Sequence, residues 1–402
     1  MLRNILLFLF ALLSLSVFAQ SKHCIFDQHL QQQLSQNREY KEKLENLEKS
    51  IRTFQNQKAD SIIRIPVVFH IVYRTAAQNI SNKQIISQLE VLNEDFRLLN
   101  ADTAMVDPAF PKGDVKIEFC FAGLDTNGQA FSGVTRKQTQ SYQVGKNSAE
   151  LFAQQPVWDS RKYLNIYVCE LGQGDAGYSS FPGWNPAQDA VVIDYSNFGV
   201  QSADKNYALG RTATHEVGHW LGLYHIWGIN QAACNDDDQV TDTPNQGVVY
   251  NGCPLGKKFS CGSQDMTSNY MGYVYDRCMA AFTPGQGSRM RNMIATARPM
   301  ISSSIPCSSD PILPERDRIV YQVHLFPNPV KEKFFVVQEG SSFSAADFSL
   351  YSIQGKEIPI DVQVTGSAAE IRIKTQRSGI FFLKFKTAEG EMVKKVALGL
   401  TK

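Results

Sequence analysis

The pattern of hydrophobic and polar residues divides the chain into segments of different character. Residues 5–18 form a continuous apolar run that follows a short basic start and ends at small residues before Gln20. This pattern is typical of a secretory signal peptide, residues 1–19, which is removed on export. A retained N-terminal anchor is the alternative. No later stretch is apolar enough to span a membrane, so none is expected in the mature chain.

Residues 20–58 are rich in Gln, Glu, Lys and Asn, with Leu44 and Leu47 at helical spacing amid charge. The pattern predicts an exposed helix over 31–52 with little capacity to form a core. In an exported enzyme, such a segment is typical of a removable pro-segment. The alternative is an ordinary N-terminal helix of the domain that follows.

Residues 59–307 alternate between buried strands and amphipathic helices. A β-branched run at 62–73 predicts a buried strand, and apolar residues at helical spacing after Ser81 predict a helix. Further strands are expected at 115–121, 163–168 and 190–194, before a helix at 211–221. This order predicts a mixed α/β domain. His70, on the first strand, is interpreted as a hydrogen-bonded core residue.

The composition changes again after about residue 298. A Ser- and Pro-rich stretch at 308–320 predicts a linker. Residues 321–402 contain short apolar runs between turns, which predict a small all-β sandwich. The strands are expected at 334–337, 348–352, 370–373, 379–385 and 393–398.

The composition is that of ordinary globular protein, with 43% hydrophobic and 20% charged residues among 402. This length allows two or three domains. The net charge of +1 gives no reason to expect binding to nucleic acid or to a membrane surface.

Three of the seven histidines lie close together at the end of the helix predicted at 211–221. His215 and His219 stand one turn apart and can share a zinc ion, with Glu216 beside them to act on water at the metal. Gly222 can adopt the left-handed conformation that ends a helix, which would bring His225 to the metal. Three nitrogen ligands leave a fourth position open, as in catalytic zinc sites. A chance match in a surface helix is the alternative, but the long motif, which adds Gly222 and His225 to H-E-x-x-H, is far more specific than H-E-x-x-H alone.

Export permits disulfides among the eight cysteines, four of which cluster between 234 and 278. Cys24 lies near the start of the polar segment. Its thiolate could occupy the open zinc position until that segment is cut away. A disulfide to another cysteine is the competing interpretation.

A turn-rich region after the histidines is dense in oxygen ligands. The carboxylates of Asp236, Asp237, Asp238 and Asp242 suit calcium, although their spacing is not that of an EF-hand. A solvated acidic loop is the alternative.

Residues 269–273, Asn-Tyr-Met-Gly-Tyr, resemble the Met-turn of metzincins, and the chain resembles one metzincin branch, the pappalysins. The likeness covers about residues 60–307. Its matching motifs are at 92–97, 100–102, 215–225, 242–244, 268–271, 278, 282–286 and 289–290.

The resemblance implies a zinc endopeptidase with an upper mixed sheet, an irregular lower subdomain and a cleft between them. It places Met271 under the histidines and makes Tyr273 a donor to the reaction intermediate. It implies the disulfides Cys234–Cys261 and Cys253–Cys278, strengthens the expectation of calcium, and makes Cys24 similar to a zinc-capping cysteine. The pairing of Cys120, Cys169 and Cys307 stays open.

The chain departs from the family near the pocket for the side chain after the scissile bond. Several relatives have an acidic residue directly before the cysteine that matches Cys278, and they favour basic residues there. This chain has Arg277 in that place and Asp276 one position earlier. A basic preference is therefore not carried over, and an acidic or relaxed preference is an equal hypothesis.

Residues 321–402 resemble the C-terminal sorting domain of the bacterial type IX secretion system. The stretch 325–330, Leu-Phe-Pro-Asn-Pro-Val, is similar to its opening motif, and 379–383 and 394–396 are similar to its end. This implies export through the periplasm and outer membrane to the cell surface or medium. A substrate-binding sandwich is the alternative.

We therefore expect a secreted zinc endopeptidase that acts on extracellular proteins or peptides, with the substrate aligned on an edge strand near 177–182. The alternatives are a zinc amidase acting on non-peptide amides and an inactive, protease-like surface adhesin.

Overall fold

The fold is described from a computed structural model of the chain. It describes residues 23–53, 61–172, 174–201, 206–229, 233–308, 324–337, 343–374, 378–387 and 390–399. The expected signal peptide, the end of the expected pro-segment at 54–58 and nearly all of the expected linker lie outside these residues. The chain divides into two compact units with a boundary after Pro314, and each is described by itself.

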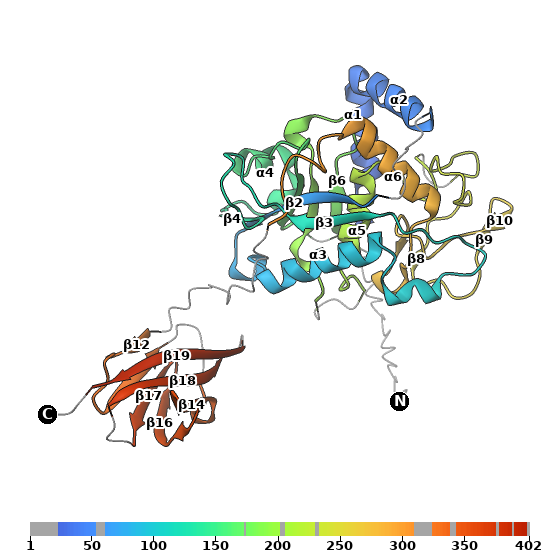
Figure 1. Ribbon diagram of the computed structural model, residues 1–402. Helices are drawn as coiled ribbons and strands as arrows, with labels where there is room; N and C mark the ends of the chain where they lie inside the picture. Colours follow the sequence, from blue (N-terminus) through green and yellow to red (C-terminus); the bar gives the residue numbers. More distant parts are fainter. Residues whose placement is uncertain are drawn as a thin grey trace, which may run out of the picture. The chain divides into compact units, whose positions relative to one another are not determined.

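Among the described residues of the first unit, seven strands form one sheet in the order β1-β6-β7-β5-β2-β3, with β4 also paired to β2 (Figure 1). All neighbouring strands run parallel except β6 and β7. The strands are β1 (His23–Cys24), β2 (Ile63–Tyr73), β3 (Ile117–Phe121), β4 (Val134–Gln138), β5 (Leu164–Cys169), β6 (Asp175–Ser179) and β7 (Val191–Asp194). The predicted mixed α/β order is confirmed.

The alternation of side chains along β2 buries both faces of this sheet. Ile65, Val67, Phe69 and Ile71 face a core shared with helices α3 (Asn82–Phe96) and α5 (Arg211–Trp220). Val72 faces the opposite side, where helix α4 (Ser148–Gln154) packs. Strand β2 is therefore a continuous apolar run in the sequence, because neither face meets water.

His70 lies in the same buried strand, and both nitrogens of its ring have hydrogen-bond partners. Its Nδ1 lies 2.9 Å from Thr135 Oγ1 and its Nε2 lies 3.0 Å from Asn165 Oδ1. Burial lowers the pKa of His70 to about 4. The interpretation of His70 as a core residue is confirmed.

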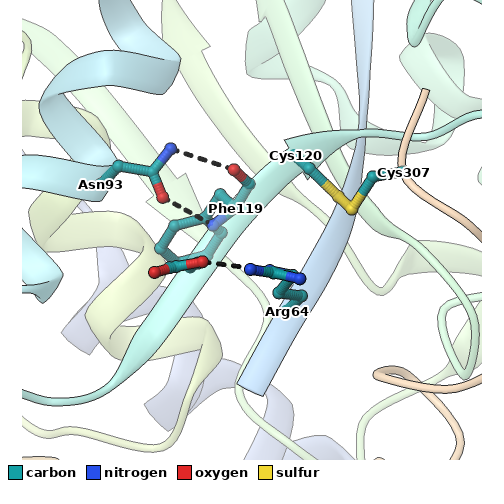
Figure 2. Close-up of a disulfide and its surroundings, with 6 residues drawn as sticks. Arg64, Asn93, Phe119, Cys120 and Cys307 are labelled. Carbon is teal, nitrogen blue, oxygen red and sulfur yellow. Dashed lines mark hydrogen bonds and ion pairs between the residues drawn. A yellow bond between two sulfur atoms is a disulfide. The ribbon is translucent and has the colours of Figure 1, made fainter. Parts of the chain in front are cut away.

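The outer strand β3 is held from two sides. The Asn93 side chain on α3 donates to the Phe119 carbonyl and accepts from the Phe119 amide, and the disulfide Cys120–Cys307 ties β3 to the end of the unit (Figure 2). Cys307 also bridges Ala122 as a short antiparallel extension of the sheet. The sequence left the pairing of three cysteines open. Cys120 and Cys307 pair with each other, and Cys169 is a buried free thiol.

Beyond α5 the chain is largely irregular until helix α6 (Pro284–Ala297). The strands there have two residues each: β8 (Asn251–Gly252), β9 (Phe259–Ser260), β10 (Ser263–Gln264) and β11 (Tyr273–Val274). The disulfides Cys234–Cys261 and Cys253–Cys278 cross this region, and they are the pairs that the resemblance implies.

The N-terminal segment differs from the exposed helix that the sequence predicts. It forms β1 and two helices, α1 (Phe26–Gln36) and α2 (Arg38–Thr53), of which α2 packs beside α6 (Figure 1). Asn37 separates the helices, and its side chain accepts from the Tyr40 amide. Phe26, Leu30, Tyr40 and Leu44 are buried against Phe181 and Tyr224. Residues 31–52 are helical and mostly exposed, as predicted. The prediction missed the buried face, because these apolar residues are too few for a core of their own but complete one with the neighbouring domain.

The second unit is a sandwich of two four-stranded antiparallel sheets, as predicted. One sheet contains β12 (His324–Phe326), β13 (Lys333–Val337), β17 (Ala368–Ile373) and β16 (Ile360–Thr365). The other contains β15 (Glu357–Ile358), β14 (Phe348–Ser352), β18 (Gly379–Thr387) and β19 (Gly390–Leu398). Alternate side chains of both sheets form one apolar core.

Candidate metal centre and active site

The three histidines of the long motif converge on one point. Their Nε2 atoms lie 3.1 Å apart for His215 and His219, 3.2 Å for His215 and His225, and 3.1 Å for His219 and His225. Gly222 has a φ of 89° and ends α5, which turns the chain back so that His225 faces the helix ligands. This left-handed turn is the one that the sequence predicts.

The donor set fits a zinc ion. Nitrogens held at about 2.0–2.1 Å in a tetrahedral arrangement lie about 3.3 Å apart, close to the observed separations. Each Nδ1 lies 2.7–2.8 Å from an oxygen: the carbonyls of Tyr270 and Leu223 for His215 and His219, and a carboxylate for His225. Each Nε2 is therefore left as the metal-binding atom.

The surroundings keep the helix ligands neutral, as a zinc ligand must be. All three histidines are buried. Burial lowers the pKa of His215 to about 3 and lowers the pKa of His219 in the same direction.

Glu216 lies between the helix ligands in sequence and points toward strand β6. It is completely buried, and burial raises its pKa to about 8, whereas hydrogen bonding with Cys24 and Ser179 acts in the opposite direction. A Cβ added at Gly177 would lie 3.1 Å from Glu216 Cγ, so glycine lets β6 approach the carboxylate closely.

Three residues of the N-terminal segment cover the metal centre. Cys24 Sγ lies within 4.8 Å of the ligand atoms of all three histidines, in the one group of metal-ligating side chains found among the described residues. Phe26 stacks on His219 with ring centroids 3.8 Å apart. The carboxylate of Asp27 lies 2.8 Å from His225 Nδ1. Cys24 forms no disulfide, so this geometry favours the zinc-capping interpretation.

Sequence reasoning missed Phe26 and Asp27, since their partners are about 200 positions away. Cys24 was recognisable because a cysteine near the start of a pro-segment has few other roles. A phenylalanine and an aspartate beside it carry no signal of their own.

Met271 and Tyr273 lie where the Met-turn resemblance implies. Met271 is fully buried against α5, and a Cβ added at Gly218 would lie 2.6 Å from its Sδ. The Tyr273 ring lies 4.8 Å from the His225 ring, and its hydroxyl donates to the carbonyl of Cys24 over 2.9 Å. Tyr273 therefore already donates to a peptide carbonyl seated at the metal centre.

A buried network around Asp95, which sequence reasoning also missed, joins α5 to the Met-turn. Asp95 accepts from Thr214 Oγ1 and from the Tyr270 hydroxyl, each over 2.7 Å. The carbonyl of Tyr270 in turn accepts from His215. The only signal in the sequence was the motif at 92–97, which carried the resemblance but no role.

The two specificity candidates are separated by the fold. Asp276 is buried and lines a small cavity together with Cys24, His215, Glu216 and Tyr273. Its Oδ2 accepts from the amides of Leu209 and Arg211, and its Oδ1 has no partner among the described residues. Burial raises the pKa of Asp276 to about 6.

Arg277 points elsewhere. Its side chain is exposed, lies over the Tyr275 ring and donates to Asn206. The cavity beside the metal centre is therefore lined by the acidic residue of the pair.

The four acidic residues of the expected calcium loop do not gather around one point within the described chain. Asp242 accepts from Thr283 and from the Gly285 amide at the start of α6, and Asp236 accepts from the Ile229 amide. Asp237 accepts from the Gln239 amide. Asp238 is buried with one oxygen unpartnered, and burial raises its pKa to about 7. Calcium stays a prediction.

Comparison with known proteins matches both units of the chain. Residues 147–295 match the family described as Pregnancy-associated plasma protein-A, and residues 324–398 match the secretion system C-terminal sorting domain. An extracellular metalloprotease of Arthroderma benhamiae is 32% identical over 271 residues, which is 65% of this chain and 82% of that protein. One from Verticillium alfalfae is 33% identical over 261 residues, 60% of this chain and 80% of that protein.

Solved structures agree with the sequence matches. Mature mirolysin of Tannerella forsythia in complex with a cleaved peptide is 44% identical, with a TM-score of 0.57 over 61% of this chain and 97% of its own. A promirolysin mutant of the same organism is 39% identical, with a TM-score of 0.62 over 70% of this chain and 96% of its own.

The chain belongs to the pregnancy-associated plasma protein-A family. This pappalysin is a secreted metallopeptidase whose first unit has the mixed fold of mirolysin. Its second unit is a type IX sorting domain. Among the described residues, no helix is both long enough and apolar enough to cross a membrane.

Proposed function

We propose that this pappalysin is a zinc endopeptidase that is synthesised with an inhibitory pro-segment and cleaves peptide bonds of extracellular proteins. The observation that carries the proposal is the convergence of three imidazole nitrogens beside the buried carboxylate of Glu216. His215, His219 and His225 would hold the ion. Bound there, zinc supplies Lewis acidity that activates a water and polarises a carbonyl.

The residues of the chain then divide the proton and charge transfers between them. Glu216 accepts a proton from the attacking water and later delivers it to the leaving amine. Tyr273 donates to the substrate oxygen as negative charge develops, as it already does to the Cys24 carbonyl. Met271 packs against α5 at Gly218 and supports the helix that carries His215 and His219.

We assign residues 20–58 as the pro-segment. Strand β1 pairs with β6 in the parallel direction and occupies the edge that a substrate would use. Cys24 takes the open ligand position, and Phe26 and Asp27 cover His219 and His225. Cleavage within 54–60, which joins this segment to the domain, would release it. A substrate would align antiparallel to β6 instead.

We also propose that Asp276 selects a basic side chain directly after the scissile bond. Asp276 has an oxygen without a partner among the described residues and lines the cavity beside His215 and Glu216, whereas Arg277 does not line it. A lysine or arginine would place its charge against this carboxylate.

The catalytic assignment is tested by Glu216→Gln, with Glu94→Gln as a control on an exposed carboxylate of α3. Activated protein is assayed on casein and on peptides, and its zinc content is measured. The Glu216→Gln variant should retain zinc and lose turnover by at least about a thousandfold. Normal turnover in that variant would refute the assignment. Cleavage of non-peptide amides but not of casein would favour the amidase, and no hydrolysis by wild type would favour the adhesin.

The pro-segment assignment is tested by Cys24→Ala in the full chain. Peptidase activity should appear before any cleavage within 54–60. Latency equal to that of wild type would show that Cys24 does not cap the metal.

A further inference from the structure

A carboxylate of the pro-segment lies in a preformed pocket on the catalytic domain. Glu48 on α2 receives two hydrogen bonds from the guanidinium of Arg289, at 2.9 and 2.6 Å, and one from the Tyr224 hydroxyl at 3.1 Å. Arg289 belongs to α6, and Tyr224 directly precedes the ligand His225. We propose that, once the pro-segment has left, this pocket binds an acidic side chain of the substrate on the N-terminal side of the scissile bond. The inference rests on the proposed function.

The guanidinium is held in place by the catalytic domain and not by the pro-segment. Arg289 Nε donates to the carbonyl of Gly222 over 2.8 Å, and the Tyr224 ring lies 5.2 Å from the guanidinium carbon. Both terminal nitrogens remain for a carboxylate. Departure of α2 therefore leaves a forked donor and a hydroxyl that are already oriented, which is the arrangement that binds carboxylates most strongly.

In the latent chain, three aromatic rings span the distance from the metal centre to this pocket; Phe181 and Tyr224 belong to the catalytic domain, and Phe26 leaves with the pro-segment. Phe26, stacked on His219, lies 5.5 Å from the Phe181 ring, and Phe181 lies 4.7 Å from the Tyr224 ring. These two steps correspond to about three residues of extended peptide. Residues three to six before the scissile bond are therefore within reach of Arg289.

The direction in which the substrate lies along β6 decides whether residues before or after the scissile bond reach the pocket at Arg289. Phe181 follows the C-terminal end of β6. A peptide antiparallel to β6 has its N-terminal residues at that end, so the pocket faces residues before the scissile bond. The pro-segment runs in the opposite direction and reaches the same pocket through α2.

A second carboxylate could compete for the guanidinium. Asp238 is buried, one of its oxygens has no partner among the described residues, and the charge of Arg289 lowers its pKa against the effect of burial. In the structure Asp238 bonds to Val240 and Thr243 and not to Arg289. If Asp238 took the place of Glu48 in the activated protein, no preference for acidic substrates would arise.

The test compares peptide pairs on the activated wild-type protein. Each pair is one cleavable peptide with Glu or Gln at a single position, either one of the third to sixth before the scissile bond or the seventh, which lies beyond the expected reach. We expect kcat/KM to be about tenfold higher for Glu at one or two adjacent positions, mainly through KM, because a bidentate charged hydrogen bond is gained. The preference should shrink in high salt. Equal kcat/KM for Glu and Gln at all five positions would overturn the inference.

Two variants locate the preference. Tyr224→Phe keeps the ring and removes the hydroxyl, so the ratio of Glu to Gln should fall about threefold while cleavage of the Gln peptide is retained. Arg289→Gln, which removes both the charge and the forked donor, should bring the ratio to one. Arg64→Gln is the control and should leave the ratio of Glu to Gln unchanged. Arg64 lies on β2 and pairs with Glu118 of β3. A preference that survives both pocket variants would assign it to another site.

Different outcomes refute the peptidase function and the carboxylate pocket. If the activated wild-type protein cleaves none of the peptides, the proposed peptidase function is refuted, and the carboxylate pocket is refuted with it. If all are cleaved with no preference, only the carboxylate pocket is refuted.

Discussion

Replacing Asp95 by asparagine should loosen the metal centre from a distance. Asp95 does not touch a histidine, but it holds Thr214 of α5 and Tyr270 of the Met-turn together, and Tyr270 orients His215. Asparagine has nearly the same shape, but it removes the charge and replaces one of the two acceptor oxygens by an amide donor. An effect on zinc can then pass through Tyr270 or through Thr214, which directly precedes His215.

The expected magnitude follows from the bonds that change. Asp95 is 1% exposed and accepts two hydroxyl hydrogen bonds, with Arg211 at 3.5 Å. Hydrogen bonds to a charged acceptor contribute about 1.5–3 kcal/mol each, and asparagine retains part of them. The unfolding free energy should therefore fall by about 2 kcal/mol, which lowers Tm by about 4–8 °C for a domain of this size. Zinc affinity should fall by about tenfold, the lower end for outer-shell partners.

The assay measures Tm by calorimetry and the zinc Kd by competition with a chromogenic chelator. Glu94→Gln removes the neighbouring but exposed carboxylate and should change neither value. Asp95→Glu, which restores the charge, should recover part of the zinc affinity. The reasoning would be refuted if Asp95→Asn matched Glu94→Gln in both Tm and zinc affinity.

Three further outcomes are expected. Burial lowers the pKa of His70, so the unfolded chain binds more protons than the folded chain between pH 6.5 and about 4. The unfolding free energy, measured by chemical denaturation, should therefore fall by about 3 kcal/mol as the pH falls through that window. The fall should be smaller in His70→Gln. Replacing Cys120 and Cys307 by serine opens a loop of 187 residues, which should cost about 5 kcal/mol by chain entropy, seen as a lower denaturation midpoint. Tyr273→Phe should lower kcat about a hundredfold with unchanged zinc content, whereas an unchanged kcat would remove Tyr273 from the mechanism.

The local part of this molecule was predictable from the sequence. His215, Glu216 and His219 share one helix, and Gly222 supplies the turn that returns His225, so eleven consecutive residues build most of the metal centre. Continuous apolar runs placed β2, β5 and β7 because both faces of these strands are buried, and helical periodicity placed α3 because one face of it meets the core. The alternating runs of the sorting domain predicted its sandwich for the same reason.

The contacts between distant segments were decided by the tertiary structure alone. The sequence offered Asp276 and Arg277 as equal candidates, and only the turn after β11 buries one of them and exposes the other. The polar N-terminal segment was expected to be exposed, but its scattered apolar residues are buried because the catalytic domain supplies the partner rings. The hydrogen bonds from Arg289 to Glu48 and between His225 and Asp27 join residues that are 241 and 198 positions apart. A carboxylate and its partner at such a separation leave no periodic trace in the sequence, so only folding brings them into contact.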